Sequence, residues 1–245
     1  MKRFMLANLV FLFSIGAFAG TRDFRINRNA VENGYAVAWG VPGQKTDFEA
    51  IEKDDKKVDE FINTAVVHNY LVDIEQDRIL LDLTGNNPDS EVDYRLGDYH
   101  IGNHFNIALS NIEIDNKGGF DREAIAVIEN NKWSNQLTKI VILNREGKET
   151  TVSAELPDAQ EKIMNAIREK LTKEQWKKLS EGAINISLET SFLEKYGYVN
   201  VVRLDSAIPK SDDPGVAVSA YVQLSIKDGK TEAKVLSLKY KKVTF

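Results

Sequence analysis

Residues 70–80, YLVDIEQDRIL, read as a β-hairpin, with an apolar run, a polar turn and a second apolar run. Two later stretches have the same order: residues 139–149 (KIVILNREGKE) and residues 221–231 (YVQLSIKDGKT). Apolar and β-branched runs bounded by turn residues favour strands, and a short Gly-containing turn between two such runs favours a hairpin. The chain is therefore predicted to be built largely from antiparallel hairpins.

Further strands are predicted outward from these hairpins. Each is a short apolar or alternating run next to a turn, and together they indicate an α+β, β-rich fold with about ten strands and three helices. The strand positions are 35–40, 65–74, 79–83, 105–114, 124–128, 137–143, 150–154, 184–188, 199–204, 216–226 and 231–243. The polar stretch 84–97 is predicted to be a loop.

Two capping boxes predict helices. Thr46-Asp47-Phe48-Glu49 is expected to open a helix that runs to about Thr64, with Thr46 as the N-cap. Pro157 fits the start of a second helical segment, and the box at 172–175 is expected to divide that segment into two helices before Gly182. Trp176 lies one turn before Leu179 on a helix that is otherwise mostly charged, so we expect it to face the core.

The runs that precede the first two hairpins, YAVAWG at 35–40 and AIAVIE at 124–129, extend the likeness between them. The first run follows an Asn33-Gly34 turn. This arrangement resembles the blades of TolB-like or WD40-like propellers. It is also similar to a loose group of uncharacterised exported bacterial proteins that carry YAVAWG and NYLVD segments. The resemblance implies propeller-blade-like repeats, of which the chain has room for two or three beside its helices. The alternative is a set of ordinary hairpins in a β-rich protein.

The first nineteen residues have the pattern of a secretory signal peptide. Lys2 and Arg3 precede an uncharged apolar run, and Ala17-Phe18-Ala19 forms a cleavage site before Gly20. We expect an exported protein, periplasmic or secreted, with one β-rich globular domain over residues 20–245 and a candidate sub-boundary near 156. The apolar run is short for a membrane span, and none is expected after cleavage.

Composition narrows the classes of partner. Removing residues 1–19 leaves 30 basic and 37 acidic residues, a formal net charge of −7, which argues against nucleic acid or an anionic membrane surface as the main partner. The chain has no Cys, which excludes disulfides and thiolate metal sites.

His100 and His104 are the first candidate site residues. Their i, i+4 spacing places both imidazoles on one face of a helix or a strand, where Asp93 or Asp98 could complete a zinc site. Ile101 stands where the zinc-protease motif has Glu, so that motif fails. Two histidines beside Gly97 and Gly102 more often bind loop backbone, and we expect no metal and no cofactor.

Aromatic residues near loops, Trp133 and Tyr99 among them, offer a binding surface together with His100 and His104. The alternative is that these rings pack over the sheet. No serine-nucleophile motif is present. The preferred prediction is an exported soluble protein, not an enzyme, that binds an unknown protein or small-molecule partner. The alternative is an exported hydrolase with its site in the loop region 93–104.

Overall fold

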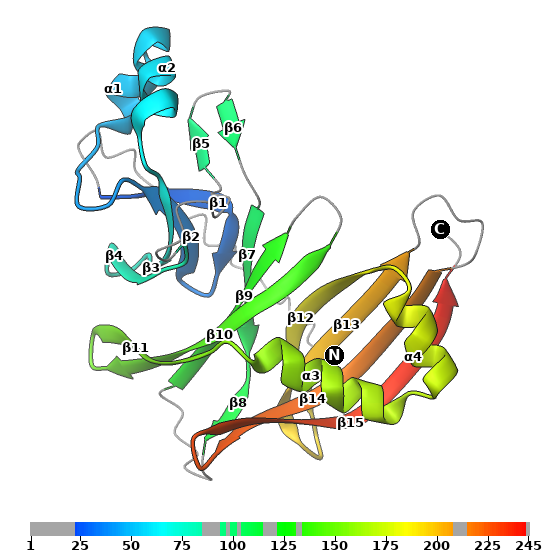
Figure 1. Ribbon diagram of the computed structural model, residues 1–245. Coiled ribbons are helices and arrows are strands. Elements are labelled where there is room, and N and C mark those ends of the chain that lie inside the picture. Colours follow the sequence, from blue (N-terminus) through cyan, green and yellow to red (C-terminus); the bar gives the residue numbers. More distant parts are fainter. Residues whose placement is uncertain are drawn as a thin grey trace, which may run out of the picture.

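The computed structural model describes residues 23–84, 94–96, 99–101, 104–114, 122–130, 134–207 and 215–243. These residues form three sheets with four antiparallel main strands each, a two-stranded ribbon and four helices. Figure 1 shows the N-terminal sheet, the central sheet and the C-terminal sheet in that order across the molecule. The predicted β-rich, antiparallel class is confirmed, with one more helix than expected.

The N-terminal sheet is a meander whose neighbours in the sequence are also neighbours in space. It consists of β1 (Arg25–Glu32), β2 (Tyr35–Gly40), β3 (His68–Asp73) and β4 (Arg78–Asp82). Asn33 and Gly34 both have positive φ angles, of 47° and 84°, as a tight hairpin turn requires. At the other end of β2, a Cβ on Gly40 would lie 2.3 Å from the carbonyl oxygen of Asp23, so only glycine allows this close backbone approach.

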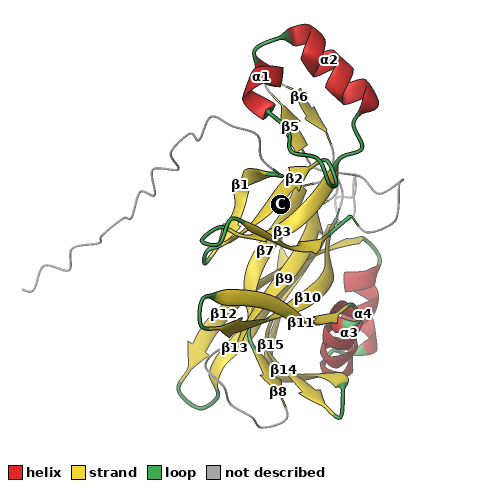
Figure 2. Cartoon of the chain, turned by 90° about the vertical axis from the view of Figure 1, so that its left-hand side faces the viewer, coloured by secondary structure: helices red, strands yellow, loops and turns green. Residues whose placement is uncertain are grey.

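A small cap covers one end of this sheet, as Figure 2 shows. It consists of α1 (Phe48–Glu52), α2 (Asp55–Thr64) and the ribbon of β5 (Tyr94–Leu96) and β6 (Tyr99–Ile101). Trp39 lies at its centre, with its ring centroid 4.8 Å from that of Phe48 and 5.3 Å from that of Tyr94. The stretch predicted as a loop, 84–97, therefore contains a strand at its end.

The predicted N-cap Thr46 is wrong. Asp47 caps α1 instead, because its Oδ1 accepts a hydrogen bond from the Ala50 N–H at 3.0 Å, while the Thr46 side chain is buried. The single helix expected to Thr64 is two helices. Asp54 adopts an extended conformation and its carboxylate accepts from the Lys56 N–H, which starts a new helix.

The middle of the central sheet is buried on both faces. It consists of β7 (His104–Ser110), β9 (Arg122–Asn130), β10 (Asn135–Glu146) and β11 (Glu149–Leu156). Ile125 and Val141 pack toward Tyr35 and Leu71 of the N-terminal sheet, whereas Ile140 packs on the opposite side with the C-terminal sheet. This double burial explains why β9 and β10 read as nearly continuous apolar runs instead of alternating ones.

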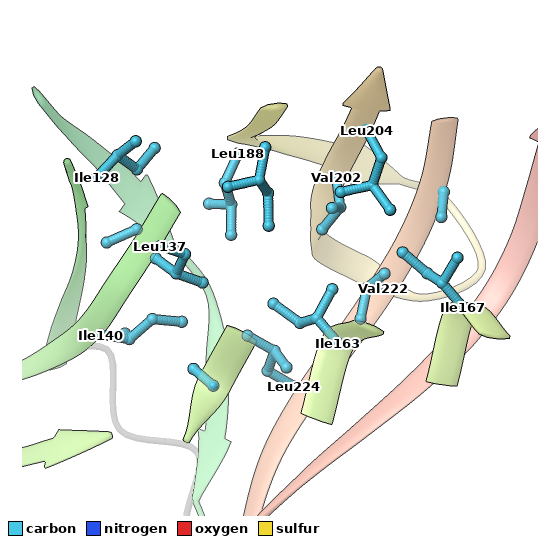
Figure 3. Close-up of a cluster of buried hydrophobic side chains, with 14 of the residues drawn as sticks. Ile128, Leu137, Ile140, Ile163, Ile167, Leu188, Val202, Leu204, Val222 and Leu224 are labelled. Atoms are coloured by element: carbon cyan, nitrogen blue, oxygen red, sulfur yellow. The ribbon is translucent and has the colours of Figure 1, made fainter. Parts of the chain in front are cut away.

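The C-terminal sheet carries the longest strands and two helices. Its elements are β12 (Ala183–Leu193), β13 (Gly197–Ala207), β14 (Gly215–Lys227), β15 (Lys230–Val243), the short β8 (Ile112–Ile114), α3 (Ala159–Lys170) and α4 (Lys173–Ser180). β8 pairs in parallel with the end of β14, and the other pairs are antiparallel. Ile163 and Ile167 of α3 point into the core between this sheet and β10, as Figure 3 shows. That core joins residues on both sides of position 156.

The second capping box is confirmed. The Thr172 hydroxyl accepts from the Gln175 N–H, and the Gln175 side chain accepts from the Thr172 N–H. Trp176 packs its ring partly on the large core, and the guanidinium carbon of Arg168 lies 5.6 Å from the ring centroid. The ring therefore faces the core, as predicted, but it is only half-buried.

A buried asparagine joins β8 to the C-terminal sheet. β13 pairs with β14 as far as Asn200, which lies opposite Val222. From Leu224 onward, β14 pairs with β8 on that side instead. The fully buried Asn200 side chain lies where β14 changes its partner from β13 to β8. Its Oδ1 accepts from the Ser110 hydroxyl and from the Asn111 N–H, both at 2.9 Å, and its Nδ2 donates to the Asn111 carbonyl at 2.8 Å. We call this arrangement the Asn200 clamp.

The three hairpins predicted from the repeated stretches are confirmed as β3–β4, β10–β11 and β14–β15. Each belongs to a different sheet. The last has Asp228 and Gly229 at positive φ angles of 50° and 72°, as its Lys-Asp-Gly-Lys turn predicts.

Candidate functional site

The structure distributes the predicted site residues over several elements. Trp133 lies outside the described residues, as do Asp93 and Asp98. His100 lies in β6 and His104 begins β7, so the two histidines belong to different strands. Tyr99 is the first residue of β6; the side chains of these three residues are outside what the structure describes. The binding role assigned to these residues stays a prediction.

A pocket that the sequence did not indicate lies where the central sheet, α3 and the C-terminal sheet meet. Its volume is about 340 Å³, within the range of small-molecule sites. We call it the amide pocket. Its described lining comes from the start of β10, one face of α3 and the start of β12: Ser134, Asn135, Gln136, Gln160, Met164, Gly182, Ala183, Ile184 and Ile186.

The walls of the amide pocket are tied to one another by side-chain amides. Gln160 of α3 accepts a hydrogen bond from the Leu137 N–H of β10 at 2.7 Å. Asn185 of β12 accepts from the Asn135 N–H of β10 at 3.0 Å and donates to the Asp205 carboxylate at 3.1 Å. These bonds fix the three walls before any ligand enters, so the ordering cost of binding is small.

The lining has two chemical characters. Asn135, Gln136 and Gln160 supply amide groups, which both donate and accept hydrogen bonds. Met164 and Ile184 supply apolar surface and pack against the large core. None of the described lining residues carries an ionisable side chain. Because burying an unpaired charge is costly, such a pocket favours an uncharged ligand with one apolar and one hydrogen-bonding part.

A second candidate site, a histidine paired with a carboxylate, lies on the N-terminal sheet. The Nδ1 of His68 lies 2.6 Å from the Oδ2 of Asp82, and the His68 ring lies 6.2 Å from the Tyr70 ring, centroid to centroid. A carboxylate at Nδ1 orients an imidazole and leaves Nε2 to exchange a proton with another group. Burial, together with the nearby Asp82 charge, raises the pKa of Tyr70 to about 12.

Polar groups also fill the seam between the N-terminal and central sheets. Gln76 donates to the Thr150 hydroxyl at 2.9 Å and accepts from the Thr150 N–H at 3.3 Å. The buried Tyr35 hydroxyl contacts Glu123 and Thr150, and burial, followed by Glu123, raises its pKa well above the usual range. An exposed ion pair between Arg145 and Glu75 borders the seam. These groups contact one another between the two sheets, so we assign them to the joining of the sheets.

Within the described part of the chain, no three His, Asp or Glu side chains gather where they could hold a metal ion. No described helix is long and apolar enough to cross a membrane. A scan against protein-family models and a search of curated proteins find no match to this chain.

Proposed function

We propose that this chain is an exported binding protein, not an enzyme, that holds an uncharged amphipathic small molecule in the amide pocket. The observation that carries the proposal is the described part of the lining: amides and apolar side chains without an ionisable group, on walls already fixed by hydrogen bonds. Binding, not bond breaking, suits such a set, because acid–base catalysis requires a titratable group at the reacting atoms.

Export is part of the proposal and rests on the signal-peptide pattern of residues 1–19. N-terminal sequencing of the secreted or periplasmic protein should begin at Gly20, because Ala17 and Ala19 are the small pair that ends the apolar run. Mature protein that still begins at Met1 would contradict the proposed export but would not bear on the proposed binding in the amide pocket.

The blade-like repeat is also a proposal. Three sheets with four antiparallel main strands each support it, because each sheet contains one of the similar hairpins. We infer that the three sheets are blade-like units that stack through shared apolar faces. Under this inference the amide pocket lies between the second and third units.

The binding test uses the uncharged, environment-sensitive fluorophore prodan. With about 17 non-hydrogen atoms at roughly −0.3 kcal/mol each, its Kd should be on the order of 10⁻⁴ M. Saturable binding with a blue-shifted emission is expected for the natural sequence. Met164→Trp should fill the pocket and weaken binding at least tenfold, whereas Met164→Leu, which conserves volume, should change it little.

Two results would contradict the pocket. One is prodan binding that survives Met164→Trp while the variant melts like the parent. The other is tighter binding of a matched charged dye such as 1-anilinonaphthalene-8-sulfonate, because the described lining residues offer a charge no ionised partner.

The His68–Asp82 pair favours a second candidate, an exported hydrolase with His68 as general base. The test is a screen with p-nitrophenyl acetate and p-nitrophenyl phosphate. Activity lost in His68→Gln and kept in His104→Ala would support this candidate. Activity lost only in His104→Ala would instead support the loop region 93–104, and no turnover in the natural sequence would leave binding as the function.

A further inference from the structure

Three exposed aromatic residues gather at the end of one hairpin. Phe192 is 61% exposed and lies one residue before the end of β12, while Tyr196 and Tyr198, 41% and 64% exposed, lie in the turn and at the start of β13. The other large hydrophobic side chains recorded as exposed in the described chain, Val31 and Val66, lie far away in the sequence. We call Phe192, Tyr196 and Tyr198 the aromatic tip.

The rings of the aromatic tip are ordered by the hairpin. Phe192 and Tyr198 are directly opposite in the register, with ring centroids 5.3 Å apart and planes at 68°, an edge-to-face pair. The ammonium of Lys195 lies 5.0 Å from the centroid of the Tyr196 ring. Two of the three rings are therefore held together at the surface, and a cation lies beside the third.

The hairpin explains these positions but not their residue types. On this face of β12 and β13, the pair Leu188 and Val202 is buried in the core. Two residues further along each strand, Asn200 belongs to the clamp, and the next pair is Phe192 with Tyr198. This face is therefore apolar in the core, polar at the pair Thr190 and Asn200, and aromatic again at its exposed end, where polar residues would cost nothing.

We propose that the aromatic tip is a docking surface for the headgroup region of a lipid bilayer. Aromatic side chains present about 150–250 Å² each, so the exposed fractions of the three rings amount to roughly 250–400 Å². A stable protein partner or a second copy needs about 800 Å² on each side. A bilayer has no such requirement, and tyrosine rings beside lysine are the side chains that lie at membrane interfaces.

The charge of the tip specifies the kind of lipid. The opposite charges of Glu194 and Lys195 cancel within the turn, and the whole chain carries a formal net charge of −5. Anionic lipids would therefore repel the protein as a whole. The expected surface is zwitterionic phosphatidylcholine, and binding through buried rings should change little with salt.

The test is co-flotation of the purified protein with phosphatidylcholine vesicles. The natural sequence should float with the vesicles. The double variant Phe192→Ser, Tyr198→Ser should partition at least tenfold less, with an unchanged circular dichroism spectrum. Val66→Ser, which removes a valine that is 65% exposed elsewhere, should partition like the natural sequence. In a Phe192→Trp variant, brominated phosphatidylcholine should quench more fluorescence than in the parent.

Three outcomes would overturn the proposal. The first is no flotation of the natural sequence. The second is an equal loss in the double variant and in Val66→Ser. The third is a concentration-dependent dimer that the double variant abolishes, which would assign the tip to a second copy of the chain. None of these outcomes bears on the amide pocket, because Met164 and the tip lie in different elements.

Discussion

Replacing Asn200 with alanine is the sharpest test of how the C-terminal sheet is held together. The substitution leaves three groups without their partner: the Ser110 hydroxyl and both the N–H and the carbonyl of Asn111. A buried polar group left unsatisfied costs about 1–3 kcal/mol. The Ser110 hydroxyl can rotate to another acceptor, so the two backbone groups dominate. We expect a loss of about 3–5 kcal/mol in the free energy of unfolding.

A double-mutant cycle separates the clamp from ordinary truncation. Ser110→Ala alone should cost about 1 kcal/mol, because Asn200 Oδ1 still accepts from the Asn111 N–H. In the double variant, the Ser110 substitution should cost almost nothing further, since its partner is already gone. The coupling energy should therefore be about 1 kcal/mol.

Urea denaturation followed by circular dichroism measures all four corners of this cycle. Asn63→Ala is the matched control, because Asn63 is exposed on α2 and, among the described residues, its side chain bonds only to the Asp59 carbonyl. That control should change stability by about 0.5 kcal/mol or less. A loss below roughly 1 kcal/mol for Asn200→Ala, or strictly additive effects of the two substitutions, would refute the reasoning.

Three further predictions concern packing and pH. Gly40→Ala should destabilise the fold by about 2–4 kcal/mol in urea melts, because its Cβ would meet the Asp23 carbonyl; an unchanged midpoint would contradict this contact. Because the folded pKa of Tyr70 exceeds the unfolded value, stability is kept below about pH 10 and lost as pH rises toward about 12. Tyr70→Phe should flatten that alkaline loss in melts at a series of pH values, and an identical slope would exclude Tyr70 as its source. Trp176→Ala should cost about 1–3 kcal/mol in chemical denaturation, less than for a fully buried ring; a loss above about 4 kcal/mol would mean that the ring is buried in solution.

The hairpins and the second pair of helices could be predicted because their signals are local. The β14–β15 turn has Asp-Gly at its centre, and the Thr172 capping box needs only four residues. The sequence of β1, RINRNAVE, has no strand period and only two β-branched residues, Ile26 and Val31, so no strand is predicted there. It becomes a strand because its backbone pairs with the free edge of β2. The prediction for the first helix is wrong because Asp47, the residue after Thr46, caps α1, and Asp54 then caps a second helix.

The candidate site could not be predicted from the sequence for a physical reason. The walls of the amide pocket come from residues near 135, 160 and 184, which the fold brings together and no local motif connects. Asn and Gln are also common residues whose presence in a sequence does not indicate a site. Histidines and aromatic rings suggest a site by their chemistry alone, whereas Gln160 and Asn185 matter because of where the fold places them. Only Trp133, next to Ser134 in the sequence, pointed near this region.

The central claim is that the amide pocket binds an uncharged amphipathic small molecule. Native mass spectrometry of the protein purified from its own envelope, without denaturant, tests this most directly. We predict one copy of an uncharged molecule per chain in the natural sequence and in Met164→Leu, and none in folded Met164→Trp. A bound molecule that carries a net charge, or one that Met164→Trp retains, would contradict the account.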